Sequence, residues 1–207
     1  MSGAPAISLR QPSAAEVRAF LARQKGRPFS YPHVGATRGN PPAGFDSDHN
    51  RTRLGSGDAA FDAARAAIRS WRMARLGWVE LRTADEEAPP ATGLEVAMLA
   101  HLFGLWWLNA ARVVYTVDED GPVRRFGFAY GTLEDHAEMG EERFTVEQLE
   151  DGSVWYDLYA FSRPAYWPVR LGYPLARRLQ RRFQVDSKAA MEHAVRETTY
   201  VSSWTSI

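Results

Sequence analysis

The residue best suited to chemistry in this sequence is Glu142, in the stretch GEERFTVEQ. Alternate residues of a β-strand point to opposite faces, so Glu142 is expected to share an inward face with Phe144 and Val146. A carboxylate in an apolar cavity has a raised pKa unless a cation pairs with it, and such a group suits general acid or base catalysis. The alternatives are a salt bridge to a nearby arginine and simple exposure at the end of the strand.

A set of polar and aromatic side chains is expected to face the same interior. The alternation in LWWLNAARVVYTV, RRFGFAYGTL and VWYDLYAFSR assigns to this set Trp107, Asn109, Tyr115, Tyr130 and Tyr156. An aromatic-lined interior with a few convergent polar groups is typical of small-molecule pockets, so these residues are predicted to bind an apolar or aromatic ligand. The alternative is that the hydroxyl and amide groups satisfy one another in a solid core.

The stretch SYPHVGATRGNPPAGFDSDHNRTRLGSG, residues 30–57, is rich in glycine, proline, arginine and histidine. Its VGATRG segment lacks the spacing and the lysine of a phosphate-binding loop, so nucleotide binding is not favoured. The stretch leads into a strand and then a helix, where a cavity would have one edge. The residues predicted to gate or brace that edge are Tyr31, Arg38, His49 and Arg51.

Metal and cofactor sites find little support in the sequence. The five histidines are scattered, without the H-x-x-x-H or H-E-x-x-H spacing of zinc ligands, although His49 lies among oxygen donors in DSDHNR. Cysteine is absent, which excludes thiolate ligands, disulfides and cysteine nucleophiles. No G-x-S-x-G elbow occurs either. We therefore expect no metal and no cofactor.

The 207 residues include 25 basic and 25 acidic side chains, so no overall charge attracts nucleic acid or an anionic membrane. A local cluster, ARRLQRRF, has arginines at 177, 178, 181 and 182, which could contact phosphate or simply form a solvated helix face. The apolar run at 94–117 is interrupted by four polar or charged residues and reads better as two strands than as a membrane span. With no secretory signal apparent, a cytoplasmic location is the default expectation.

Periodicity along the chain predicts an α+β fold. Helices are expected at 13–25 and 57–77 and near the C-terminus, where apolar positions recur at helical spacing through 171–194. Turns at Phe103-Gly104, EDGP and EDGS separate antiparallel strands. The strands are predicted at 45–54, 78–83, 94–102, 105–118, 123–133, 138–149 and 153–162. Residues 1–44 then form an N-terminal extension, 45–199 the main domain, and 200–207 a tail.

This order of elements resembles the helix-grip fold of START-like and pollen-allergen-like proteins. In that fold a strongly bent antiparallel sheet, here of about seven strands, wraps around the last helix and leaves a cavity between them. The blocks YPHVGATRG, DHNRTRLG, RFGFAYGTL, GEERFTV and RRLQRRF are similar to those of a bacterial and plant family known only as a domain of unknown function. That resemblance implies the fold and brings no activity with it.

Three functions remain open from the sequence. The first is a small-molecule binding protein with an internal cavity. The second is an enzyme on the same scaffold, a cyclase, dehydratase or hydrolase-like activity that uses Glu142 as acid or base. The third is an interaction module that uses the arginine-rich helix and an aromatic patch at Tyr166 and Trp167. The oligomeric state stays open.

Overall fold

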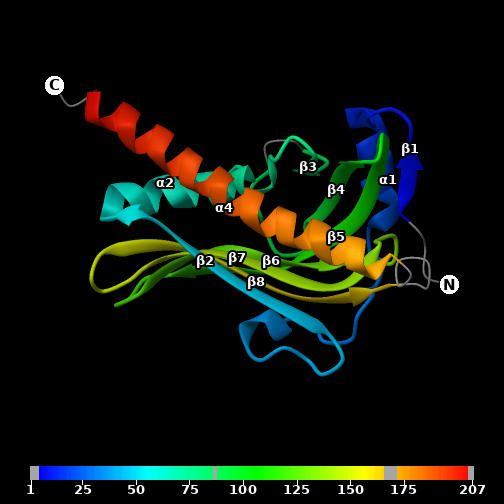
Figure 1. Cartoon of the computed structure of the whole chain (residues 1–207), viewed down its shortest axis with the longest axis horizontal. Helices are drawn as coiled ribbons and strands as arrows, with labels where there is room; N and C mark the ends of the chain where they lie inside the picture. Colours follow the sequence, from blue (N-terminus) through cyan, green and yellow to red (C-terminus); the bar gives the residue numbers. More distant parts are fainter. Residues whose placement is uncertain (1–4, 86–87, 166–171, 205–207) are drawn as a thin grey trace.

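The computed structural model of the chain describes residues 5–85, 88–165 and 172–204, and Figure 1 shows it as a cartoon. Eight strands form one antiparallel sheet in the order β2-β8-β7-β6-β5-β4-β3, with β1 paired to β5 off this path. The strands are β1 Ala6–Ser8, β2 Asp46–Ser56, β3 Val79–Arg82, β4 Glu95–Leu102, β5 Leu105–Glu119, β6 Arg124–Thr132, β7 Glu138–Gln148 and β8 Ser153–Pro164. The seven strands predicted after residue 44 are confirmed to within two residues at each end.

The helices are α1 (Ala14–Gln24), the short η1 (Ala36–Arg38), α2 (Asp58–Arg69), the short η2 (Arg72–Ala74) and α4 (Tyr173–Trp204). Helix α1 starts where the sequence predicts, because Ser13 and Glu16 form a reciprocal capping box. The helix predicted at 57–77 is shorter, since Trp71 adopts a left-handed conformation that ends it. Leu171, the first residue of the predicted C-terminal stripe, lies outside the described residues.

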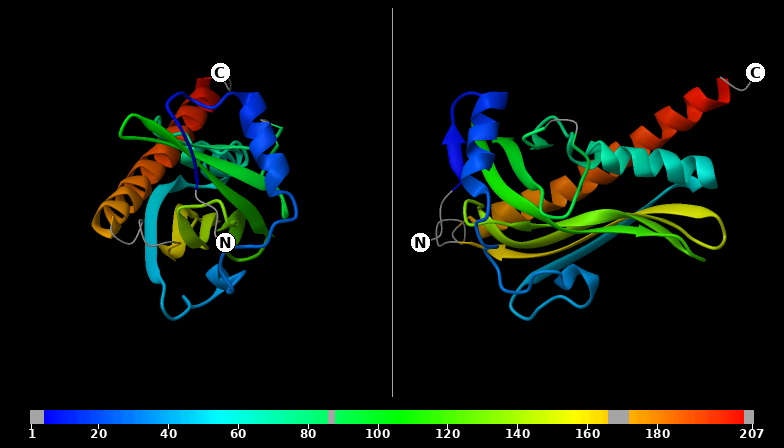
Figure 2. Two further views of the ribbon diagram at one scale, coloured as in Figure 1. Left: turned by 90° about the vertical axis from the view of Figure 1, so that its right-hand side faces the viewer. Right: turned by 180° about the vertical axis from the view of Figure 1, so that it is seen from behind.

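The long helix α4 lies across the concave face of the sheet, with α2 beside it (Figures 1 and 2). Alternate strand residues supply that face, so Phe128, Phe144 and Leu158 pack with Ile68 of α2 and Met191 of α4 in one buried core. All five side chains are almost completely buried. The expected α+β architecture, a bent antiparallel sheet wrapped around the last helix, is thereby confirmed.

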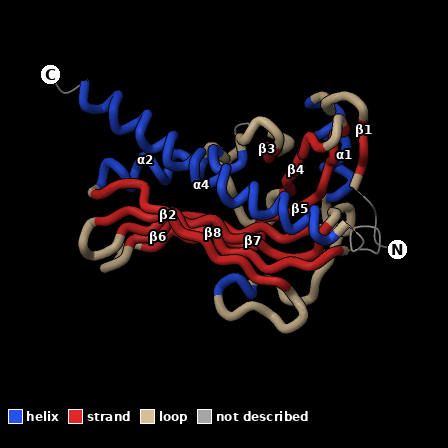
Figure 3. The backbone as a smooth tube through the Cα atoms, in the orientation of Figure 1, coloured by secondary structure: helices blue, strands red, loops and turns tan. Residues whose placement is uncertain are grey.

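A smaller core lies on the opposite, outer face of the sheet. Val17, Phe20 and Leu21 of α1 pack there against Leu99 of β4 and Leu108 of β5. Figure 3 shows α1 and β1 at the end of the molecule where β4 and β5 rise beside α4. The first residues of the chain therefore support the outer side of the sheet.

Candidate ligand-binding cavity

A cavity of about 410 Å³ lies between the concave face of the sheet and the N-terminal half of α4. Its size is within the range of small-molecule sites. Apolar and aromatic side chains make up most of the wall. They include Met98 of β4, Trp107 of β5, Phe103 at the β4–β5 turn, and Leu179 and Phe183 of α4. Figure 2 shows α4 crossing this side of the sheet.

Glu142 of β7 lies in the cavity wall, on the same face as Phe144 and Val146, as the strand alternation predicts. The Tyr130 hydroxyl donates a hydrogen bond of 2.6 Å to its Oε2. No ion pair among the described residues includes Glu142, so the salt bridge considered from the sequence is not found in that part of the chain. Burial raises the pKa of Glu142 to about 7, against the lowering effect of the Tyr130 bond.

A second carboxylate of the wall, Glu138, lies four residues earlier on β7 and on the same face. Burial is the main cause that raises its pKa, and hydrogen bonds from Ser162 and Gln180 oppose that rise. The Gln180 side chain of α4 donates to Glu138 and also to the Ser162 hydroxyl, at 3.0 Å. This bridge connects the helix to β7 and β8 across the cavity. Sequence reasoning missed Glu138, which alternation alone would have assigned to the inner face.

Trp107, Asn109 and His136 form the wall opposite to α4. The Asn109 side-chain oxygen accepts from the Ala137 amide at 3.1 Å, so Asn109 fixes the segment before β7 rather than standing free. The His136 Nδ1 accepts from the Glu138 amide at 3.0 Å, which puts the proton of a neutral ring on Nε2. Burial lowers the pKa of His136 to about 4, so the ring is neutral at physiological pH.

Two N–H groups in this wall lack acceptors. Neither Nε2 of His136 nor Nε1 of Trp107 has a hydrogen-bond partner among the residues that the structure describes, and both atoms are buried. Buried donors are nearly always satisfied in folded proteins, so such groups need an explanation. His136 was not singled out from the sequence because it lies in an irregular turn, where no periodicity assigns a face.

Two of the predicted ligand-binding residues do not line the cavity. Tyr156 is inward but fully buried in the core, where its hydroxyl pairs with Ser187 of α4 at 2.9 Å. Tyr115 lies on the outer face, so its predicted inward position is wrong. The reason is a β-bulge, because the register of β5 against β6 shifts between Val113 and Tyr115 and the extra residue reverses the alternation. Trp107, Asn109, Tyr130 and Glu142 are the predicted residues that the cavity brings together.

The N-terminal residues predicted at the cavity edge lie on the outer face instead. Tyr31 donates to the buried Glu141 carboxylate at 2.6 Å, and the Gly35 and Thr37 amides donate to it at 2.6 and 2.9 Å. The Thr37 hydroxyl also contacts Glu141. Arg38 stacks on the Tyr115 ring, 4.1 Å from its centroid. Residues 31–38 are therefore bound to the back of β7, and do not border the cavity.

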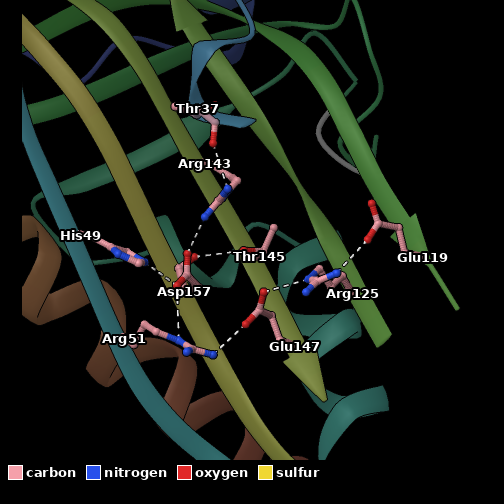
Figure 4. A network of polar contacts seen from close by, with 9 residues as sticks. All are labelled: Thr37, His49, Arg51, Glu119, Arg125, Arg143, Thr145, Glu147 and Asp157. Atoms are coloured by element: carbon pink, nitrogen blue, oxygen red, sulfur yellow. Dashed lines mark hydrogen bonds and ion pairs between the residues drawn. The ribbon is translucent and has the colours of Figure 1, made fainter. Parts of the chain in front are cut away.

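His49 and Arg51 belong to a polar network on the same outer face, shown in Figure 4. The buried Asp157 of β8 lies at its centre. It contacts His49 Nε2 at 2.6 Å, Arg51 Nε at 3.3 Å and Arg143 at 2.9 Å. Arg51 also pairs with Glu147 at 2.7 Å. Because β2 is the edge strand that pairs with β8, these contacts join it to the sheet, away from the cavity.

The arginine-rich part of α4 is partly used within the chain. Arg177 makes a bidentate pair with Asp48 of β2 at 2.6 and 2.8 Å, and Arg182 lies 4.4 Å from the centroid of the Trp78 ring. The expected patch at Tyr166 and Trp167 lies outside the described residues.

The described histidines and acidic residues contain no group of three that could hold a metal ion. None of the described helices is both long and apolar enough to cross a membrane.

These features define the class of the protein, a helix-grip protein with a cavity between its sheet and its last helix and with Glu138 and Glu142 in the cavity wall. Within that class, the chain belongs to the family described as "Domain of unknown function (DUF1990)", which matches residues 30–190. It is 35% identical over 206 residues to a UPF0548 protein of Dictyostelium discoideum, covering 90% of this chain and 94% of that protein. It is 40% identical over 185 residues to a UPF0548 protein of Deinococcus radiodurans, covering 84% and 91%. The resemblance noted in the sequence is thus confirmed.

Similar solved structures are more distant. A hypothetical protein from Helicobacter pylori matches with a TM-score of 0.49 and 13% identity, over 71% of this chain and 88% of that one. Ara h 8.0201 matches with a TM-score of 0.44 and 11% identity, over 74% and 99%.

Proposed function

We propose that this protein binds a small, largely apolar or aromatic molecule in the cavity between its sheet and α4. The observation that supports it is the cavity itself, about 410 Å³ of space with a mostly apolar wall and only a few polar groups. A sheet and a helix that only needed a core would close this space, since protein interiors are packed at close to crystal density. The polar groups of the wall, among them Tyr130 and Glu142, orient the bound molecule.

Native mass spectrometry of the protein purified from its own organism tests the proposal, because a co-purifying molecule would identify the ligand class. A matched pair of variants on α4 tests the location. Ala176 lines the cavity, whereas Ala189 is exposed on the same helix. Ala176→Phe should abolish binding of the co-purifying molecule and Ala189→Phe should leave it unchanged. Equal binding by both variants would show that the molecule is bound elsewhere, and the proposal would fail.

A second candidate function, acid or base catalysis by Glu142, is favoured by one observation. A carboxyl group with a pKa of about 7 is close to equally protonated and ionised at neutral pH, which is the most useful state for proton transfer. The Tyr130 hydroxyl holds it in a fixed position, 2.6 Å away. Glu142→Gln keeps the size of the side chain and removes the titration. If the protein is an enzyme, this variant should bind the ligand and lose turnover; a turnover equal to that of wild type would exclude the role.

A further inference from the structure

The charges around the cavity have one sign. Its wall contains four acidic residues, Asp48, Glu138, Glu141 and Glu142, whereas none of the described residues that line it is a lysine or an arginine. The only histidine of the described wall, His136, is neutral at physiological pH. An isolated negative charge in an apolar cavity is unfavourable, so such a carboxyl group stays protonated unless a positive charge lies close to it.

Two of the four carboxylates are compensated within the chain. Both oxygens of Asp48 accept hydrogen bonds from Arg177, which cancels its charge. Glu141 is turned to the outer face, where Tyr31, the Gly35 amide and two donors of Thr37 surround it. The charge of these two groups is therefore satisfied before any ligand binds.

Glu138 and Glu142 are the carboxylates whose charge is not compensated in this way. Their hydrogen-bond donors are neutral, namely Gln180 and Ser162 for Glu138 and Tyr130 for Glu142. Arg177, which pairs with Asp48, also favours the ionised form of Glu138 but makes no ion pair with it. Among the described residues, Glu142 has a donor to Oε2 and none to Oε1. These two side chains are on the same face of β7, and both are in the cavity wall.

The aromatic rings of the wall are also suited to a cation. Trp107, Tyr130 and Phe183 contribute rings to the cavity, and the face of an aromatic ring attracts positive charge. Outside the cavity, the exposed Arg182 guanidinium makes such a contact with one residue of the wall, 4.4 Å from the centroid of the Trp78 ring. Arg182 also pairs with Asp186 at 3.4 Å, so a cation between a ring and a carboxylate is a contact that this part of the molecule already makes.

We propose that the ligand of the cavity is an organic amine, with its ammonium group against Glu142 and Glu138 and its apolar body against the aromatic wall. This inference rests on the proposed binding function and names the chemical class of the ligand.

Binding of an amine should depend on pH in a characteristic direction. An alkylamine keeps its charge at neutral pH, as the lysine side chain does. Glu142 has a pKa of about 7 in the free protein, and an ammonium ion beside it favours the ionised form. Amine binding should therefore release a proton and become tighter as pH rises through neutrality. The charged and titratable groups that act on Glu142 from neighbouring elements are Tyr130, Tyr156, Glu138 and Asp48, together with Arg177 that pairs with Asp48.

A neutral acceptor would show the opposite behaviour. If the ligand only accepted hydrogen bonds, protonated Glu142 would be its donor, and binding would weaken as pH rises. An anionic ligand would be repelled by ionised Glu138 and Glu142 and would also bind best at low pH. The pH dependence of binding therefore separates an amine from the other two classes, which differ from each other in charge.

The experiment compares octylamine, octanol and octanoate, which share an alkyl chain and differ in charge, by calorimetric titration at several pH values. Wild type should bind octylamine about tenfold or more tightly than octanol at about pH 8, with octanoate weakest, as expected for a charge-assisted hydrogen bond. The preference for octylamine should fall to near unity in the Glu138→Gln, Glu142→Gln double variant. Glu150→Gln, a change at an exposed position, is the control and should keep it.

The outcomes separate this inference from the proposed function. If octanol binds as tightly as octylamine, or octanoate more tightly, the cavity binds small molecules and the amine inference is wrong. If the octylamine preference is the same in the double variant, the two carboxylates do not recognise the charge and the inference is again wrong. If none of the three ligands binds, the amine inference is wrong. The proposed function is then decided separately, by the Ala176→Phe and Ala189→Phe pair.

Discussion

The raised pKa of Glu142 predicts a change in stability with pH that can be measured without knowing the ligand. The pKa is about 7 in the folded protein and 4.5 ordinarily, so between these values the folded state holds a proton that the unfolded state has released. Unfolding then becomes easier as pH rises, because stability falls wherever the native state binds more protons than the unfolded state. This direction is opposite to that of a carboxylate that forms a salt bridge.

The magnitude follows from the two pKa values. Each pH unit between them corresponds to about 1.4 kcal/mol, so ionised Glu142 reduces the free energy of unfolding above neutral pH by up to about 3 kcal/mol. The Glu142 side chain is only partly buried from solvent, and solvent screening makes about 3 kcal/mol an upper value. Glu142→Gln removes the titration and keeps an oxygen that can accept from the Tyr130 hydroxyl. The variant should therefore gain stability over wild type as pH rises.

Urea denaturation of wild type and Glu142→Gln at a series of pH values measures this difference. We expect it to grow by about 2–3 kcal/mol in favour of the variant between about pH 4.5 and pH 8. Glu138 titrates in both proteins, so most of its effect cancels in the comparison. Glu150→Gln is the control, with a difference that stays flat. A flat difference for Glu142→Gln would mean that the Glu142 carboxyl is ordinarily solvated, and the description of the cavity wall would have to be abandoned.

Three further substitutions test the two faces of the sheet. Tyr130→Phe removes the hydrogen bond that lowers the pKa of Glu142, so the upper end of the pH range over which stability falls should move to higher pH in the same urea series. Glu141→Gln weakens the charge-assisted contacts that hold residues 31–38, which should cost about 2–4 kcal/mol and make that segment cleavable in limited proteolysis. Gly131→Ala would place a methyl carbon 2.1 Å from the Tyr31 hydroxyl and should lower the free energy of unfolding by at least about 2 kcal/mol in thermal unfolding. Gly121→Ala is the control and should have little effect, because its methyl carbon would lie 3.9 Å from the nearest atom, the Val123 carbonyl oxygen.

The sheet and the main helices could be predicted because their signals are local. Strand alternation places Glu142, Phe144 and Val146 on one face, and the Ser13 and Glu16 pair marks the start of α1. What could not be predicted depends on residues far apart in the chain. The bulge that turns Tyr115 outward is set by how β5 pairs with β6, and no residue in the run VVYTV predicts it.

Parts of the cavity wall and of the N-terminal segment could not be predicted for the same reason. His136 lies in a turn, and its burial and its unpaired N–H arise from strands and a helix that pack around it. The 31–38 segment was interpreted as a cavity edge because it precedes the first strand of the main domain. Its true position depends on the donors that it offers to Glu141, a contact across more than 100 residues of sequence. Such a contact is invisible to any local pattern.

The neighbours Glu141 and Glu142 show how the two faces of a strand give one residue type two chemical roles. Glu141 points outward, where the backbone and hydroxyl donors of residues 31–37 satisfy it, so its charge serves to fasten the N-terminal segment. Glu142 points inward, where one neutral hydroxyl is its donor among the described residues and burial raises its pKa. A register shift of one residue would exchange them, placing Glu141 in the cavity and Glu142 under the N-terminal segment. The pairing of β7 with β6 and β8 therefore fixes both the support of the sheet and the chemistry of the cavity.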